Sequence, residues 1–164
     1  MNNLSKLFTL IGFKITWISC IFGEIYISSW FGFFIGLVFL LSFFLYTEKK
    51  LQSFNIILIF SVLGYSFDSL LSLSNLYTIN SQNNFLFLPI WFMVLWPSFC
   101  TLLVDCFSFL KKKYFFAILL GGIFGPISYY AGLSLNLANA INYSVFFIMA
   151  IFWSSMMFIY SKYF

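Results

Sequence analysis

Residues 29–46 have the sequence SWFGFFIGLVFLLSFFLY, which contains no charged side chain. At about 1.5 Å per residue, a helix of this length approaches the thickness of a hydrocarbon core of about 30 Å. Five similar segments occur elsewhere, and the six predicted spans are residues 4–22, 29–46, 54–73, 85–110, 114–133 and 143–160. Because lipid offers no partner to unpaired backbone groups, each span must be a helix. The sequence predicts an all-α, polytopic integral membrane protein, a single transmembrane domain over residues 1–164 with six transmembrane helices.

The composition of the 164 residues supports this class. Hydrophobic residues make up 63% and charged residues 7%, whereas a soluble domain carries about 25% charged residues to cover its surface. The first predicted partner is therefore the lipid bilayer. The chain has no Arg and no His, and its Lys residues form no patch, so no nucleic-acid partner is predicted. The three cysteines are odd in number and lack a CxxC spacing, so neither a metal site nor a cofactor is predicted.

The loop lysines follow one topology, and Lys14 lies inside the first span, where its long stem can reach the interface. With a cytoplasmic N-terminus, six crossings place the 47–53 turn, the 111–113 turn and Lys162 on the same side as Lys6. The opposite side receives three stretches without any Lys, at residues 23–24, 74–84 and 136–142. Cytoplasmic loops of membrane proteins carry the excess of positive charge. Both termini are therefore predicted to be cytoplasmic.

Asp68 is the most anomalous side chain, because it lies inside the predicted third span. A carboxylate at such a depth costs roughly 2.5 to 3.5 kcal/mol on insertion scales. The functional interpretation is a site for a substrate, a cation or a proton. The structural interpretation is a polar anchor that holds helices together.

Depth along the predicted spans selects two partners for Asp68. Trp91, near the outer end of the fourth span, and Tyr129, near the outer end of the fifth, lie at a similar level. Each offers one hydrogen-bond donor on a large apolar body, as a desolvated carboxylate requires. Asp68, Trp91 and Tyr129 are therefore the candidate ligand-binding residues. Aromatic residues also mark membrane interfaces, which is the alternative for Trp91 and Tyr129.

Small residues and prolines pattern the fourth and fifth spans. Gly121, Gly125 and Gly132 follow one helical face, where another helix can approach closely. Pro126 and Pro97 lie inside their spans, where proline removes a backbone donor and bends a helix. Both a tight helix crossing and a broken helix that lines a cavity fit this pattern.

Several of these residues, taken in order, resemble a known family. The residues are Asp68-Ser69-Leu70-Leu71, Leu88-Pro89-Ile90-Trp91, Leu95-Trp96, Phe99, Gly121, Gly125-Pro126, Tyr129 and Gly132. Together they are similar to the bacterial inner-membrane family catalogued as domain of unknown function 2878. The resemblance implies a small multi-pass protein of the bacterial inner (cytoplasmic) membrane and supplies no established activity. Asp105, Phe109 and Asn136 depart from the family pattern, so the resemblance assigns no role to Asp105.

Three classes of function remain open at this point. We favour a binding, transport or accessory subunit, with a pocket near Asp68 for a small apolar or lipid-like ligand, or with another membrane protein as its partner. The alternative is an intramembrane enzyme of lipid modification, which would have to work with Asp, Glu or Cys and without His. A purely structural partner of another membrane protein is a third reading. No catalytic residue is assigned.

Overall fold

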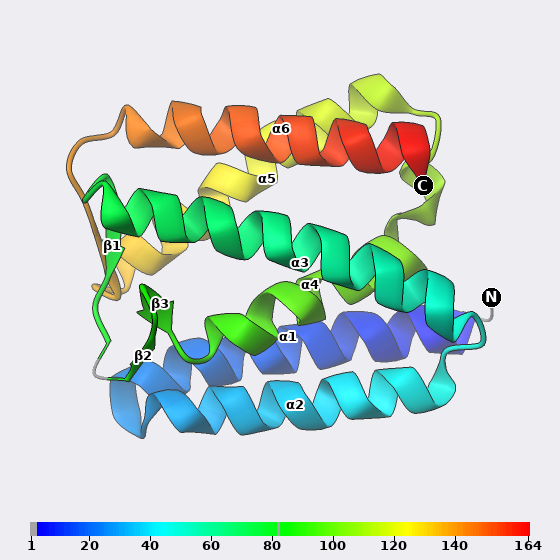
Figure 1. Cartoon of the computed structure of the whole chain (residues 1–164), viewed down its shortest axis with the longest axis horizontal. Coiled ribbons are helices and arrows are strands. Elements are labelled where there is room, and N and C mark those ends of the chain that lie inside the picture. The colour runs from blue at the N-terminus through cyan, green and yellow to red at the C-terminus, as the bar shows by residue number, and fades with distance from the viewer. Residues whose placement is uncertain (1–2, 82) are drawn as a thin grey trace. The chain divides into compact units, whose positions relative to one another are not determined.

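A computed structural model describes residues 3–81 and 83–164 of the chain (Figure 1). Its α-helices are α1 (Asn3–Tyr26), α2 (Ser29–Tyr46), α3 (Lys50–Leu73), α4 (Phe92–Asp105), α5 (Tyr114–Ser134) and α6 (Val145–Tyr163). All except α4 are long and apolar enough to cross a membrane. These five helices match the predicted spans closely, and α2 has the predicted bounds. The prediction of a helical protein with several helices long and apolar enough to span a membrane is confirmed.

The predicted fourth span, residues 85–110, is wrong in its length. The helix α4 has 14 residues, or about 21 Å, which is short of a hydrocarbon core. Before it, β2 (Asn84–Phe85) and β3 (Leu88–Pro89) pair antiparallel, with Leu86 in the turn at a φ of 56°. After it, residues Phe107–Leu110 form the 3₁₀ helix η1. The hairpin sets the start of α4, because its backbone groups pair with each other before the helix begins.

The residues group into two compact units. The first comprises Met1–Leu70 and Ser81–Phe107, and the second comprises Leu71–Asn80 and Ser108–Phe164. The prediction of a single domain over residues 1–164 stays a prediction.

In the first unit, α1 packs against α2 and α4, and α2 packs against α4 (Figure 1). Glycines permit the close approach. A Cβ on Gly32 of α2 would lie 2.4 Å from the Cα of Cys20 on α1, so only glycine fits there. Within the same unit, α3 is joined to β2 by the Tyr65 hydroxyl, which donates to the Phe85 carbonyl at 2.8 Å.

In the second unit, α5 packs against α6. The polar stretches at one end of these helices contain β1 (Tyr77–Ile79) and β4 (Ala138–Ala140), which pair antiparallel with Thr78 opposite Asn139. These stretches were expected only as loops, since a three-residue strand leaves no periodic signal in a sequence.

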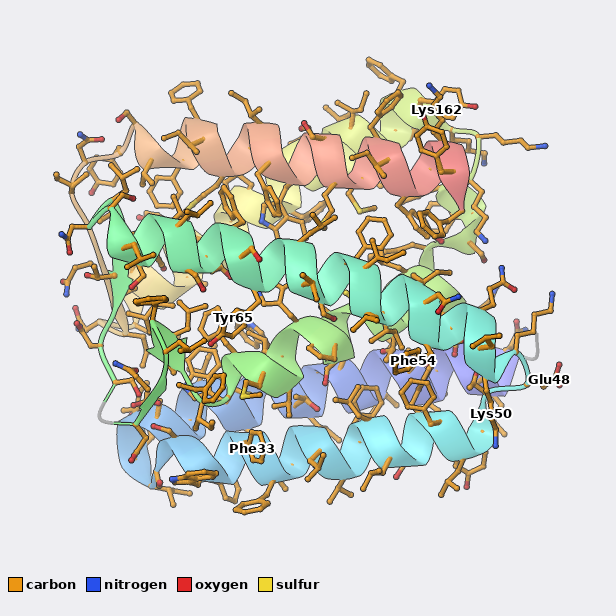
Figure 2. All side chains as sticks on the ribbon, in the orientation of Figure 1. Phe33, Glu48, Lys50, Phe54, Tyr65 and Lys162 are labelled. Carbon is orange, nitrogen blue, oxygen red and sulfur yellow. The ribbon has the colours of Figure 1, made fainter. Side chains whose placement is uncertain are left out.

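Lysines gather at one end of each unit. In the first unit, the ring of Phe8 lies 5.3 Å from that of Tyr46, so the start of α1, with Lys6, lies beside the α2–α3 turn, where Figure 2 shows Glu48 and Lys50. In the second unit, the backbone N–H of Lys112 donates to the Ser161 carbonyl at 2.9 Å. The 111–113 turn and Lys162, labelled in Figure 2, therefore share one end of the α5–α6 pair.

Candidate ligand-binding site

Glu24 and Trp91 form a pair at the end of the first unit that lacks lysines. The indole Nε1 of Trp91 donates to Oε2 of Glu24 at 2.7 Å. Glu24 lies in the last turn of α1, and Trp91 is the residue before α4, where its side chain is only 4% exposed. Hydrogen bonds to a carboxylate are short and strong, so this contact fixes the Glu24 side chain.

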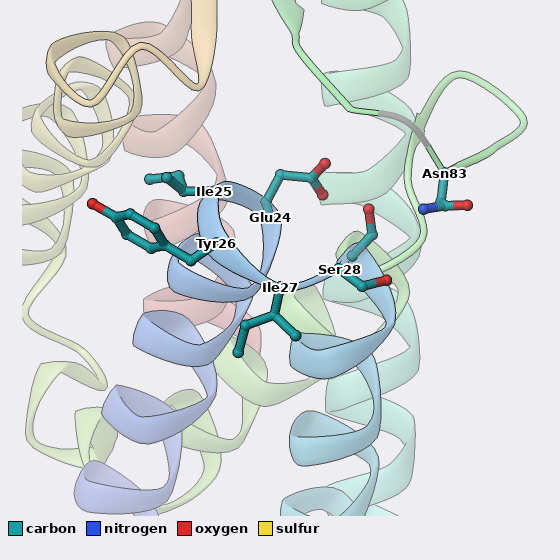
Figure 3. A pocket seen from close by; sticks show the side chains of 7 residues that line it. Glu24, Ile25, Tyr26, Ile27, Ser28 and Asn83 are labelled. Carbon is teal, nitrogen blue, oxygen red and sulfur yellow. The ribbon is translucent and has the colours of Figure 1, made fainter.

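A pocket of about 230 Å³ opens beside Glu24 (Figure 3). Its lining is Glu24, Ile25, Tyr26, Ile27, Ser28, Ser29 and Asn83. In Figure 3, the side chains of Glu24 and Ser28 point to the side where Asn83 lies, whereas those of Ile25 and Tyr26 point the other way. The polar wall therefore presents a carboxylate, hydroxyls and an amide to one small volume.

The chain path explains this wall. The helix α1 ends at Tyr26, and Ser28 caps α2 by accepting a hydrogen bond from the Trp30 N–H at 3.3 Å. The hydroxyl of Ser29 is within 3.2 Å of that of Ser81, which holds the stretch before β2 against this turn. Serine at a helix start is favoured because its oxygen satisfies a free backbone N–H.

Asp68 takes its indole donor from a tryptophan other than the predicted one. The side chain of Asp68 is 4% exposed, and its Oδ2 accepts a hydrogen bond from Nε1 of Trp96 at 2.7 Å. The indole N–H of Trp91 is committed to Glu24, so Trp91 does not supply a donor to Asp68. Asp68 lies five residues before the end of α3, and Trp96 lies four residues after the start of α4, so the two match in depth. Because the hairpin occupies residues 84–89, the residue at this depth is Trp96.

Asp105 is held by hydroxyl groups. Its Oδ2 accepts from Thr9 Oγ1 at 2.7 Å and from Ser5 Oγ at 3.1 Å, both on α1. Asp105 is 4% exposed and Thr9 is fully buried. The observed partners give it a role in packing α1 against α4.

Tyr129 lies in the second unit and is 8% exposed. Its backbone carbonyl accepts from the Tyr77 hydroxyl at 2.8 Å, and the two rings lie 5.4 Å apart. Its assignment as a ligand-binding residue stays a prediction, as do those of Asp68 and Trp91.

The small residues and prolines of the predicted pattern lie as follows. A Cβ on Gly121 would be 2.5 Å from the Trp153 carbonyl oxygen, and one on Gly125 would be 2.2 Å from the Trp153 ring. A Cβ on Gly132 would be 3.0 Å from the Tyr77 hydroxyl. Pro97 lies inside α4 and Pro126 inside α5.

Sequence reasoning missed Glu24 as a site residue. One signal was present, because Glu24 is the sole acid in the lysine-free stretches that were predicted to face the outside. Its pairing with Trp91 joins residues 67 positions apart. No periodic pattern reports such a contact.

The helices and their buried acids define the class: a helical protein with helices apolar and long enough to span a membrane, and with carboxylates held by indole and hydroxyl groups. The family described as "Protein of unknown function (DUF2878)" matches residues 6–159, and the chain belongs to it. The resemblance that the sequence indicated is therefore confirmed. Neither a curated protein nor a solved structure gives a match to the chain.

Proposed function

We propose that the protein is a membrane-embedded binding subunit that recognises a small amine-bearing molecule in the Glu24 pocket. The observation that carries the proposal is a partly buried carboxylate, fixed by Trp91 at 2.7 Å, in the wall of a polar pocket. Oε1 of Glu24 has no protein donor within the described residues and is left for a ligand. An ammonium group is the natural partner of such an oxygen, since charge-assisted hydrogen bonds are the strongest that a small ligand can make.

The rest of the pocket wall suits the polar part of such a ligand. The oxygen of Ser28 already accepts from the Trp30 N–H, so its hydroxyl hydrogen is available to donate. Asn83 adds an amide, which both donates and accepts. A molecule with an ammonium group and a nearby hydroxyl or phosphate oxygen would satisfy both kinds of group. Ethanolamine, free or as a lipid headgroup, has this chemistry.

The orientation that we propose places this pocket on the outside of the bacterial inner membrane, with both termini cytoplasmic. Support comes from the loop lysines, which lie at one end of each unit, and from the absence of lysine at the Glu24 end of the first unit. Reporter fusions at the 111–113 turn test the orientation. Activity of a periplasm-dependent reporter there would contradict it.

Asp68 and Tyr129 remain part of the proposal as candidate ligand-binding residues. Asp68 is buried beside Trp96, which suits either a deeper ligand contact or an anchor between helices. Replacing Asp68 by Asn separates these roles. Loss of protein abundance without any loss of binding by the remaining protein would identify an anchor.

The binding proposal is tested by thermal unfolding of the purified chain in mild detergent with added ethanolamine. Binding to the folded state raises the midpoint of unfolding as the ligand concentration increases. The wild-type midpoint should rise, and that of Glu24→Gln should not. Glu48→Gln is the matched control, because Glu48 is an exposed acid of the α2–α3 turn and should leave the response intact.

Two further measurements show whether the amine is a free molecule or a lipid headgroup. Nanodiscs of phosphatidylethanolamine and of phosphatidylcholine distinguish a lipid headgroup from the free molecule. Stabilisation by phosphatidylethanolamine that is lost in Glu24→Gln would assign the headgroup. Equal behaviour of wild type and Glu24→Gln with both free and lipid-bound amine would refute the proposal.

A further inference from the structure

The helices α1 and α4 meet along a line of polar side chains, which we call the α1–α4 seam. At one end Thr9 donates to Asp105, and at the other Trp91 donates to Glu24, both at 2.7 Å. These two hydrogen bonds fix how the antiparallel helices are aligned. The seam comprises Thr9, Thr16 and Glu24 on one side and Asp105, Ser98 and Trp91 on the other.

The alignment places Thr16 and Ser98 at the same level. Thr16 follows Thr9 by seven residues, and Ser98 precedes Asp105 by seven. Each is therefore about 10 Å along its helix from the Thr9–Asp105 bond. Seven residues are nearly two full turns, so each side chain also lies on the face that its helix turns toward the other.

Gly36 on α2 supports this placement independently. A Cβ on Gly36 would lie 2.8 Å from Cβ of Val94 and 3.0 Å from Cγ2 of Thr16. Thr16 and Val94 therefore lie beside the same point on α2. Val94 is one turn before Ser98 on α4, which keeps Thr16 within about a turn of Ser98.

Both hydroxyls at this level are buried without a partner. Thr16 and Ser98 are each 0% exposed, and neither Thr16 Oγ1 nor Ser98 Oγ has a hydrogen-bond partner among residues 3–81 and 83–164. A buried hydroxyl that makes no hydrogen bond costs about 1 to 3 kcal/mol. Two such groups at one level of one seam indicate a shared ligand.

The two hydroxyls suit a buried water. Such waters make about three hydrogen bonds, and each hydroxyl can donate one and accept others.

We propose that the α1–α4 seam binds a water molecule between Thr16 and Ser98. A cation is the poorer match, because the carboxylates of the seam, Asp105 and Glu24, each lie about 10 to 12 Å along the helices from this level. Water both donates and accepts, as two facing hydroxyls require. The site stands independently of the amine-binding proposal.

A double-mutant cycle tests the site on the full chain in detergent. Thr16→Val and Ser98→Ala remove one hydroxyl each, and the midpoint of thermal unfolding is measured for both and for their combination. With a shared water, each single change lowers the midpoint by about 2 to 4 °C, and the combination lowers it no further than one of them. In a dry seam, each change removes an unpaired polar group and raises the midpoint, and the shifts add. Additive shifts in either direction overturn the proposal.

Ser53→Ala provides the control for additivity. Ser53 is 1% exposed and its hydroxyl is within 3.2 Å of that of Thr47, at the start of α3. Combined with Thr16→Val, this change should give the sum of the two single shifts, because distant sites do not couple.

A second measurement needs no variant. Radiolytic footprinting produces radicals from bound water, which oxidise the side chains beside it. Val94 and Val145 are 3% and 1% exposed, in the first and second units. Oxidation of Val94 well above that of Val145 is the expected result. Equal protection of the two valines would overturn the proposal even if every substituted chain failed to fold.

Discussion

Trp96 and Asp68 join α4 to α3 through one hydrogen bond, Nε1 to Oδ2 at 2.7 Å, and the indole ring that makes it lies on a glycine. A Cβ on Gly64 would be 2.3 Å from Cε3 of Trp96. Gly64 is one turn before Asp68 on α3. The indole ring of Trp96 therefore packs against the backbone at Gly64, while its N–H donates to Asp68. Gly64 and Asp68 therefore act together to hold the side chain of Trp96.

Substitution of Gly64 by Ala should displace the indole ring from Asp68. The ring is rigid and Trp96 is 4% exposed, so it cannot turn aside without a cost of about 1 to 3 kcal/mol. We expect a lower midpoint of thermal unfolding and a shift in tryptophan emission. Gly122→Ala is the control, because the nearest atom there is the hydroxyl of Ser154, which can rotate at the cost of one exposed hydrogen bond to the Ile118 carbonyl. Equal costs for the two changes would contradict the seating of Trp96 on Gly64.

The Trp96–Asp68 bond itself should appear as a coupling between the two positions. We expect Trp96→Phe to cost more in the wild-type background than in Asp68→Leu, with a coupling of about 1 to 3 kcal/mol. The free energy of unfolding in mixed micelles measures each corner of this cycle. A coupling near zero would show that the indole packs there without a useful hydrogen bond.

Apolar length predicted most of the helices, because crossing a hydrocarbon core requires a long uncharged run. Residues 29–46 show this directly, since the predicted span and α2 have the same bounds. The same signal failed for residues 85–110. Residues 85–91 are as apolar as a helix would be, yet they form a hairpin and a turn, and hydropathy carries no record of the path that the backbone takes.

That failure explains the incorrect partner for Asp68. A depth counted from residue 85 selects Trp91, whereas a depth counted from the start of α4 at Phe92 selects Trp96. The acid and the residue type of its donor were predictable from the sequence, because a buried carboxylate needs a donor on an apolar body. The register between two helices was not, since it depends on contacts far apart in the chain.

Thr9 should support Asp105 more strongly than Ser5 does. The Thr9 hydroxyl is fully buried and 2.7 Å from Oδ2, whereas the Ser5 hydroxyl is partly buried and 3.1 Å away. We therefore expect Thr9→Val to lower the free energy of unfolding by about 1 to 3 kcal/mol and Ser5→Ala by less. Detergent-micelle unfolding gives both values. A larger loss in Ser5→Ala would contradict this prediction and identify Ser5 as the main donor to Asp105.

Gly121 and Gly125 should respond differently to a second change in Trp153, although both lie against it. A Cβ on Gly121 would meet the Trp153 carbonyl oxygen at 2.5 Å, and one on Gly125 would meet the ring at 2.2 Å. Backbone cannot move without separating α5 from α6, but a ring can be replaced by a smaller side chain. We expect Gly121→Ala and Gly125→Ala each to lower the midpoint of unfolding. Trp153→Ala removes the Cγ and Cδ1 atoms that a Cβ on Gly125 would meet at 2.2 and 2.5 Å, and leaves only its own Cβ at 2.7 Å. It should therefore reduce the cost of Gly125→Ala and leave that of Gly121→Ala in place. The comparison uses Trp153→Ala alone as its reference, because loss of a large buried side chain is itself costly. Rescue of both glycine variants, or of neither, would mean that the α5–α6 crossing is governed by contacts other than these two.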